Sequence, residues 1–253
     1  MFAILKNTYL KNIADAIRTK AGVSTTYKPK DMPSAILNLP TTHIDGGALA
    51  KEIVNGSIDV YSDDTIRILR SGVFWNCRNL NTLNCTAVTN VAERALYECT
   101  VLKHVYLPAC TTLAPYSFYS CSSLEEISLE NVTGAALNVF ENCTSLEKVY
   151  LPALSNTIQA VFKGCTALEK AWLGYVSAIY RDAFSGCTAL KTLVLNYNGT
   201  VTLSTTDAFT GCTNVTVYVR RTYVSWYQTA TNWAATGFTF EAIEDHPEIL
   251  NLW

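Results

Sequence analysis

The sequence predicts an α/β solenoid, a rod of about seven similar 22-residue coils whose strands stack in parallel. Cysteine is the first sign, because it returns every 22 residues and then once after 25. These cysteines are Cys77, Cys99, Cys121, Cys143, Cys165, Cys187 and Cys212. A phenylalanine or leucine stands three residues before each of them, and a leucine or valine three residues after. A fixed period of this length indicates a solenoid, since one coil cannot bury its apolar face without its neighbours.

Each coil is expected to hold one half-buried strand. In the coil around Cys143, Val149 and Leu151 alternate with Lys148 and Tyr150, which is the period of a strand. The proline that follows ends the strand, because it has no N–H for a ladder. The Phe-x-x-Cys segment is predicted to be a compact helical or near-helical turn. A second short apolar point in the coils is formed by Val88, Cys110, Val132, Leu154 and Val176.

The cysteine column is interpreted as a set of buried, reduced thiols. Reduced cysteine behaves as a small apolar residue that suits a core. The sequence has no CxxC pair, and His43, His104 and His246 are isolated, so no metal site and no cofactor are expected. The column members also occupy equivalent positions, which leaves no privileged disulfide partners.

The repeat pattern A-F-x-x-C-x-x-L-x-x-[VI]-x-L-P resembles the BspA-like leucine-rich repeats of bacteria and their phages. The segment from Asp182 to Leu190 is the nearest copy, and the resemblance extends over residues 57–219. It implies a leucine-rich solenoid used for surface adhesion and protein binding rather than catalysis. The chain departs from the pattern at Cys85, which replaces a strand leucine, and at three extra residues near Asn196 to Gly199.

Composition and motifs exclude several classes of function. The 19 basic and 21 acidic residues give a net charge of 19 − 21 = −2, which argues against binding to nucleic acid or anionic lipid. No apolar run is long enough to insert into a membrane. Catalytic motifs for acyl transfer, phosphate binding and zinc hydrolysis are absent, so no enzyme is expected. The adjacent pairs Asp63-Asp64 and Glu125-Glu126 are interpreted as solvated surface charge.

The sequence divides into four expected segments. Residues 1–45 form a helical attachment segment, residues 46–71 a linker and N-terminal cap, residues 72–219 the repeats, and residues 220–253 a C-terminal cap. Residues 1–45 also resemble the N-terminal module of many tailed-phage structural proteins, which implies binding to a tail protein or to a second copy of the chain.

The two caps carry their own patterns. In the N-terminal cap, Ile66 and Ile68 are expected to extend the inner column. In the C-terminal cap, a helical aromatic face is followed by a strand around Phe240 and by a loosely held tail from His246 to Trp253. The aromatic face is formed by Tyr223, Trp226, Tyr227 and Ala230.

The candidate binding surface is a ribbon of outward-pointing strand residues. Its first column contains Tyr106, Tyr150 and Trp172, which are the residue types that dominate protein interfaces. Its second column supplies His104, Glu126, Lys148 and Lys170. The alternative is that these aromatic neighbours serve only to stabilise the sheet across its strands.

The sequence therefore predicts a non-enzymatic binding protein, associated with a phage virion or tail, that contacts a protein or glycan on a host cell. It would lie in the virion, or in the host cytoplasm before assembly. A bacterial cell-surface adhesin and a phage-encoded intracellular inhibitor of a host protein are the alternatives.

Overall fold

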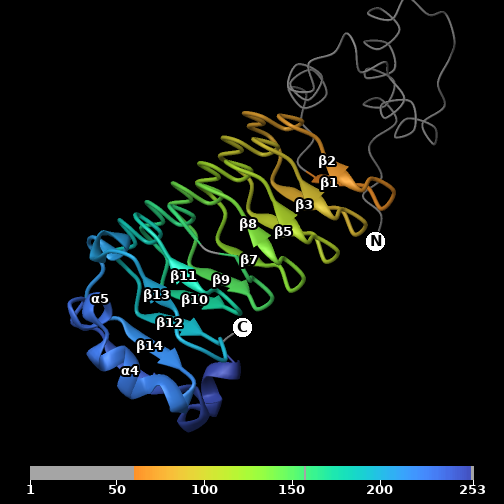
Figure 1. Ribbon diagram of the computed structural model, residues 1–253. Helices are drawn as coiled ribbons and strands as arrows, with labels where there is room; N and C mark the ends of the chain where they lie inside the picture. The colour runs from red at the N-terminus through yellow and green to blue at the C-terminus, as the bar shows by residue number, and fades with distance from the viewer. Residues whose placement is uncertain (1–59, 157, 252–253) are drawn as a thin grey trace, which may run out of the picture.

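The computed structural model describes residues 60–156 and 158–251, which wind into a rod of parallel strands (Figure 1). The segment 1–45, most of the linker, and Ile58 lie outside the described residues. The predicted solenoid is confirmed, because successive strands pair in parallel at an offset of 22 residues, as between Lys148 and Lys170. The offset grows to 24 residues between Thr192 and Thr216, where the extra residues are accommodated.

One long face of the rod is built from the predicted strand of each coil. It contains a three-stranded sheet in the order β1-β3-β5 and a six-stranded sheet in the order β15-β14-β12-β10-β9-β7. The bounds are β1 (Val60–Ser62), β3 (Thr82–Asn84), β5 (His104–Tyr106), β7 (Glu126–Ser128), β9 (Lys148–Leu151), β10 (Lys170–Leu173), β12 (Thr192–Leu195), β14 (Thr216–Val219) and β15 (Thr239–Ala242).

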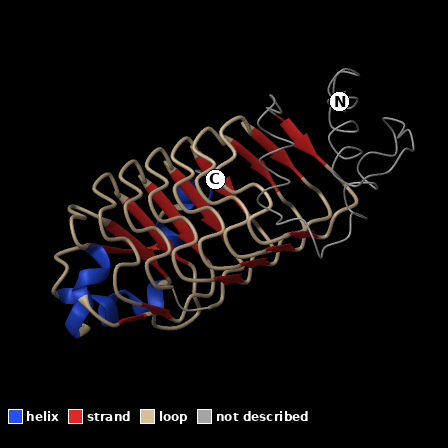
Figure 2. Ribbon diagram, turned by 90° about the horizontal axis from the view of Figure 1, so that it is seen from above, coloured by secondary structure: helices blue, strands red, loops and turns tan. Residues whose placement is uncertain are grey.

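A second, narrower face lies opposite and was predicted only as an apolar point (Figure 2). The apolar points are buried as expected, and a two-residue strand follows most of them. These strands are β2 (Ile68–Leu69), β4 (Asn90–Val91), β6 (Thr112–Leu113), β8 (Gly134–Ala135), β11 (Ala178–Ile179) and β13 (Thr202–Leu203). They pair in parallel in the orders β2-β4-β6-β8 and β11-β13, and Ile158 is bridged to Ile179.

The Phe-x-x-Cys segments are hydrogen-bonded turns rather than the predicted helices. In each, the cysteine N–H donates to the phenylalanine carbonyl three residues earlier, as from Cys143 to Phe140 at 3.2 Å. The residue just before the cysteine has positive φ, for example 61° at Asn142 and 74° at Gly164. This left-handed residue stops a helix from continuing, because right-handed helix requires negative φ. The last coil differs in having a 3-10 helix, η2 (Thr206–Phe209).

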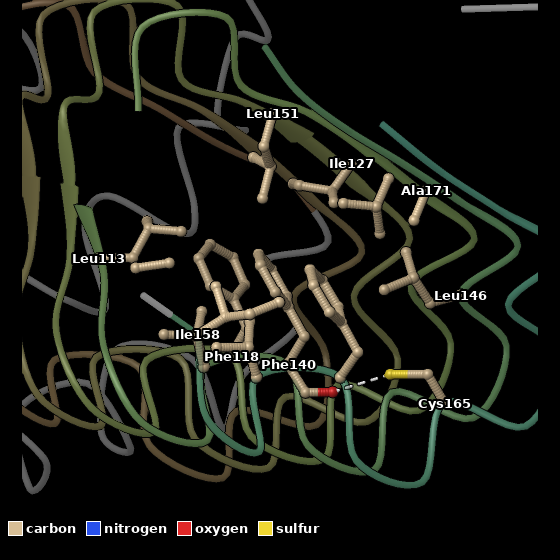
Figure 3. Close-up of a cluster of buried hydrophobic side chains, with 14 of the residues drawn as sticks. Leu113, Phe118, Ile127, Phe140, Leu146, Leu151, Ile158, Cys165 and Ala171 are labelled. Atoms are coloured by element: carbon tan, nitrogen blue, oxygen red, sulfur yellow. Dashed lines mark hydrogen bonds between the residues drawn. The ribbon is translucent and has the colours of Figure 1, made fainter. Parts of the chain in front are cut away.

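The core runs the length of the rod between the two faces, and the phenylalanine column forms its centre. Phe140 stacks on Phe118 at 5.3 Å and on Phe162 at 5.7 Å between ring centroids (Figure 3). All nine cysteines are free thiols, and eight are fully buried, while Cys212 is half-buried. The expected burial of the cysteine column is thus confirmed.

The thiols also form a ladder between coils. Each Sγ–H donates to the phenylalanine or leucine carbonyl of the preceding coil, as from Cys165 to the Phe140 carbonyl at 3.0 Å (Figure 3). The bond repeats from Cys99, Cys121, Cys143, Cys187 and Cys212. That carbonyl also accepts the backbone N–H of its own coil's cysteine, so one oxygen connects two successive turns.

At the N-terminal end, two expectations fail. Ile66 is buried, but Ile68 is 54% exposed and Leu69 takes its place in the core. Asp63 is buried rather than solvated, because its Oδ1 accepts the N–H groups of Thr65 and Ile66 and the Thr65 hydroxyl. Its carboxylate therefore closes the turn after β1.

Helices cover the C-terminal end of the rod (Figure 2). They are η3 (Arg221–Tyr223), α4 (Val224–Thr229), α5 (Thr231–Ala234), η4 (Ile243–Asp245) and η5 (Pro247–Asn251). Tyr227 is buried as expected, whereas Trp226 is 38% exposed and the buried tryptophan is Trp233. Both clamp one residue of the last coils: the Val201 N–H donates to the Tyr227 hydroxyl at 2.8 Å, and Trp233 Nε1 donates to the Val201 carbonyl at 2.7 Å.

Candidate binding groove on the first face

The residues predicted for the ribbon lie together on the outer side of the first face. His104, Tyr106 and Glu126 are exposed, and Lys148, Tyr150 and Lys170 are partly exposed. The parallel register places Lys148 beside Lys170 and Tyr150 beside Trp172. The period-two alternation of the strands produces this arrangement, because every second side chain of a strand points to the same side.

Trp172 does not belong to the exposed surface, and this part of the prediction is wrong. Its side chain is 4% exposed and packs with Val194 under Ile243 and Ile249. The tail segment that carries these isoleucines was expected to be loosely held, but it folds back as η4 and η5 onto the sheet. The tail covers this end of the ribbon because the two isoleucines bury apolar surface there.

The first face is interrupted at one rung within the described part of the rod, between β5 and β7. At neighbouring rungs, the residue after a strand donates its N–H to the next coil, as from Cys85 to the Tyr106 carbonyl and from Leu129 to the Tyr150 carbonyl, both at 3.0 Å. The equivalent bond from Leu107 to the Ser128 carbonyl is not formed. Neither is the bond from the Glu126 N–H to the Lys103 carbonyl.

The interruption has a visible effect on the strand itself. Val105 is partly exposed, while the residues paired with its position in other coils, Leu83 and Val149, are completely buried. The two coils stay joined elsewhere, since Phe118 N–H donates to the Val139 carbonyl at 3.0 Å and Thr133 N–H to the Thr111 carbonyl at 2.9 Å. The rod is therefore opened on its first face alone.

A groove of about 480 Å³ lies over this opening. Tyr106 and Tyr150 line it on the strands that flank β7, and Ser128 lies between them on β7. Because serine is much smaller than the tyrosines on either side, the groove contains a notch at Ser128. The other lining residues are Lys103, His104, Val105, Pro108, Glu126, Ile127, Glu130, Asn131 and Lys148.

Charges of both signs surround the notch. Lys103 forms an ion pair with Glu125 at 3.2 Å between Nζ and Oε1. Two lysines, Lys103 and Lys148, and two glutamates, Glu126 and Glu130, line the groove, so their charges cancel. The groove is consequently polar without a net charge from these four side chains.

Five of the seven predicted ribbon residues line this groove, whereas Lys170 and Trp172 do not. The sequence analysis missed Ser128 as a site residue, although its small size between two tyrosines of one column was a usable signal. It also missed Lys103, Pro108, Glu130 and Asn131, which lie beyond the strand ends. Nothing in the repeat pattern marks the unpaired rung.

Two further searches concern metals and membranes. Across residues 60–156 and 158–251, no group of three or more histidine, cysteine or acidic side chains is arranged to hold a metal ion. No helix in the same described ranges has the length and apolar character needed to span a bilayer.

The stacked coils and the open sheet face define a solenoid repeat protein, a class of scaffold that typically binds other molecules. The chain belongs to the BspA type leucine-rich repeat family, which matches residues 57–169 and 160–230. The resemblance inferred from the repeat pattern is thereby confirmed for the fold. No curated protein matches the sequence.

Solved structures with the same fold are similar to this chain at low sequence identity. A leucine-rich repeat protein of T. pallidum is 19% identical with a TM-score of 0.51, and the match covers 70% of this chain and 79% of that one. A leucine-rich repeat protein of Bacteroides ovatus is 20% identical with a TM-score of 0.46, over 63% of this chain. The match spans about half of the Bacteroides protein, 54% of its length. A leucine-rich cell-surface protein of Faecalibacterium prausnitzii is 17% identical with a TM-score of 0.40, over 63% of this chain and 58% of that one.

Proposed function

We propose that this chain is a non-enzymatic binding protein that holds a protein or glycan of a host cell in the groove over β5 and β7. The observation that carries the proposal is the groove itself, with Tyr106 58% exposed on a sheet whose other strands are paired. Exposed tyrosine supplies contact area at little conformational cost. A rigid sheet presents such a residue without ordering a loop, which lowers the entropic cost of binding.

The proposed setting is a phage virion or tail, with residues 1–45 as the attachment segment. Support for this setting comes from the sequence of those residues, which lie outside the described part of the chain. Proteomics of purified virions tests it directly. Recovery of the protein in the outer-surface fraction of bacteria would instead favour the adhesin, and recovery in a stable complex in the host cytoplasm would favour the inhibitor.

The binding role is tested by the double variant Tyr106→Ala with Tyr150→Ala, using labelled protein and a panel of intact bacterial and animal cells. We expect cell binding to be lost while the melting temperature changes little, because both side chains are on the surface. Tyr175→Ala is the matched control, since Tyr175 is 55% exposed and lies outside the groove. Unchanged binding by the double variant would remove the groove from consideration.

A further inference from the structure

The notch at Ser128 has the width of a single ring. Parallel strands are about 4.8 Å apart, so Tyr106 and Tyr150, which are two rungs apart, stand about 10 Å from each other. A ring held between two aromatic side chains needs about 7–8 Å, from two van der Waals contacts of about 3.5–4 Å each. The unpaired rung between β5 and β7 lies within this span. The notch therefore admits one ring with room to spare.

The floor of the groove offers backbone hydrogen-bonding groups of both kinds. The Glu126 N–H and the Lys103 and Ser128 carbonyls lack the interstrand bonds that their equivalents form at other rungs. All three residues line the groove. A ligand that satisfies such a surface must both donate and accept, and a hydroxyl group does both.

Side-chain charge and chain connectivity narrow the choice of ligand. The balanced lysines and glutamates give no preference for an anion or a cation. An extended peptide strand could pair with the open backbone, but it would need a further strand spacing of about 4.8 Å. The bonds that join the same two coils at Phe118 and Thr133 limit such an opening. A compact, neutral, polyhydroxylated ring fits these conditions better than a peptide.

We propose that the groove is a carbohydrate site that takes a neutral sugar, with one pyranose ring between Tyr106 and Tyr150 above Ser128 and its hydroxyls toward the open backbone groups of β5 and β7. This inference rests on the proposed binding function and specifies its ligand. The sugar's apolar ring face packs on tyrosine, and its hydroxyl groups replace the missing ladder bonds.

The test uses the full chain and a defined panel of sugars. The probes are neutral oligosaccharides of glucose, galactose, mannose and N-acetylglucosamine, with sialylated and sulfated glycans as charged comparators, measured on an array and by calorimetry. We expect at least one neutral oligosaccharide to bind. Ser128→Tyr fills the notch and should weaken that binding by at least about tenfold, as should Tyr106→Ala.

Ser177→Tyr is the matched control, because Ser177 is an exposed serine away from the groove. It should bind the sugar like the unmodified chain, and a native circular dichroism spectrum and melting temperature should verify the fold of every variant. No binding to any neutral sugar, binding to charged glycans alone, or full binding by folded Ser128→Tyr would each overturn the inference.

The two proposals fail in different ways. If binding to cells is lost in the Tyr106 and Tyr150 double variant and is abolished by protease treatment of the cells but not by glycosidases, the partner is a protein. That result rejects the carbohydrate site and leaves the binding function in place. If the double variant binds cells as well as the unmodified chain, both proposals fall.

Discussion

Replacing Phe140 with alanine is the most direct test of the coil-on-coil core. The Phe140 side chain is fully buried, and its ring is stacked between the rings of Phe118 and Phe162. Its removal deletes a ring at the middle of the rod, where coils on both sides depend on it. In a solenoid, stability is close to a sum over coils and their interfaces, so this change weakens two interfaces at once.

The expected cost is at the upper end of the range for such changes. Burying less apolar surface and leaving a cavity destabilises phenylalanine-to-alanine variants by about 3–5 kcal/mol. The cavity at Phe140 should collapse poorly, because the parallel ladders on both faces fix the spacing of neighbouring coils. We therefore expect a loss of about 4–5 kcal/mol in the free energy of unfolding, against a typical total of about 5–15 kcal/mol.

The assay is urea denaturation followed by circular dichroism, with Phe74→Ala as the comparison. Phe74 lies near the end of the described rod and has Tyr61 as its aromatic neighbour, at 5.0 Å between centroids. Its removal should cost about 3 kcal/mol, since fewer neighbours lose contacts. A change of less than about 1 kcal/mol at Phe140 would refute the stacked core, because no buried ring is removed so cheaply.

Three further predictions concern the cap, the tail and the thiols. Tyr227→Phe should lower the free energy of unfolding by about 1–3 kcal/mol in urea denaturation, because the buried Val201 N–H loses its acceptor. Ile249→Asp should release the tail and make Trp172 accessible to acrylamide quenching of fluorescence, because a carboxylate is costly to bury in an apolar contact. Burial raises the pKa of Cys212 to about 12, so native thiols should resist alkylation at pH 8 and stability should fall as the pH rises from about 9 toward 12.

The sign of the alkaline effect follows from the direction of the pKa change. An unfolded thiol loses its proton near pH 8.5–9, whereas the buried thiol keeps it to higher pH. The stabilisation is complete below the unfolded pKa and is lost as the pH rises through the folded pKa. Rapid alkylation of most thiols in the native protein at pH 8 would contradict the buried column. Protein denatured in urea is the positive control.

The other two predictions have equally specific controls. Tyr223→Phe is the comparison for Tyr227→Phe, because Tyr223 is only partly buried, and equal melting of the two variants would contradict the clamp on Val201. For the tail, Trp172→Phe in the Ile249→Asp background identifies the signal of Trp172. Unaltered quenching in Ile249→Asp would mean that the tail does not shield that tryptophan.

Sequence alone sufficed wherever the repeat itself carries the information. The cysteine, phenylalanine and leucine columns predicted the parallel coils, because each coil buries the same positions against the next and selection acts on them with a constant period. The slip of one residue at Tyr218 could also be predicted, and the pairing of Tyr218 with Val194 confirms it. The helical prediction for the turns failed because Asn142 and its equivalents adopt positive φ, which Phe-x-x-Cys spacing does not report.

The candidate site depended on tertiary structure that the period cannot encode. Tyr150 and Trp172 occupy the same column, yet Trp172 is buried by Ile249, 77 residues later in the chain and outside the repeats. The missing bonds between β5 and β7 arise in coils that keep the same apolar columns as the others. Periodicity records contacts that recur in every coil, whereas a folded-back tail and a single opened rung occur once. Only the three-dimensional arrangement decided which part of the ribbon stays accessible.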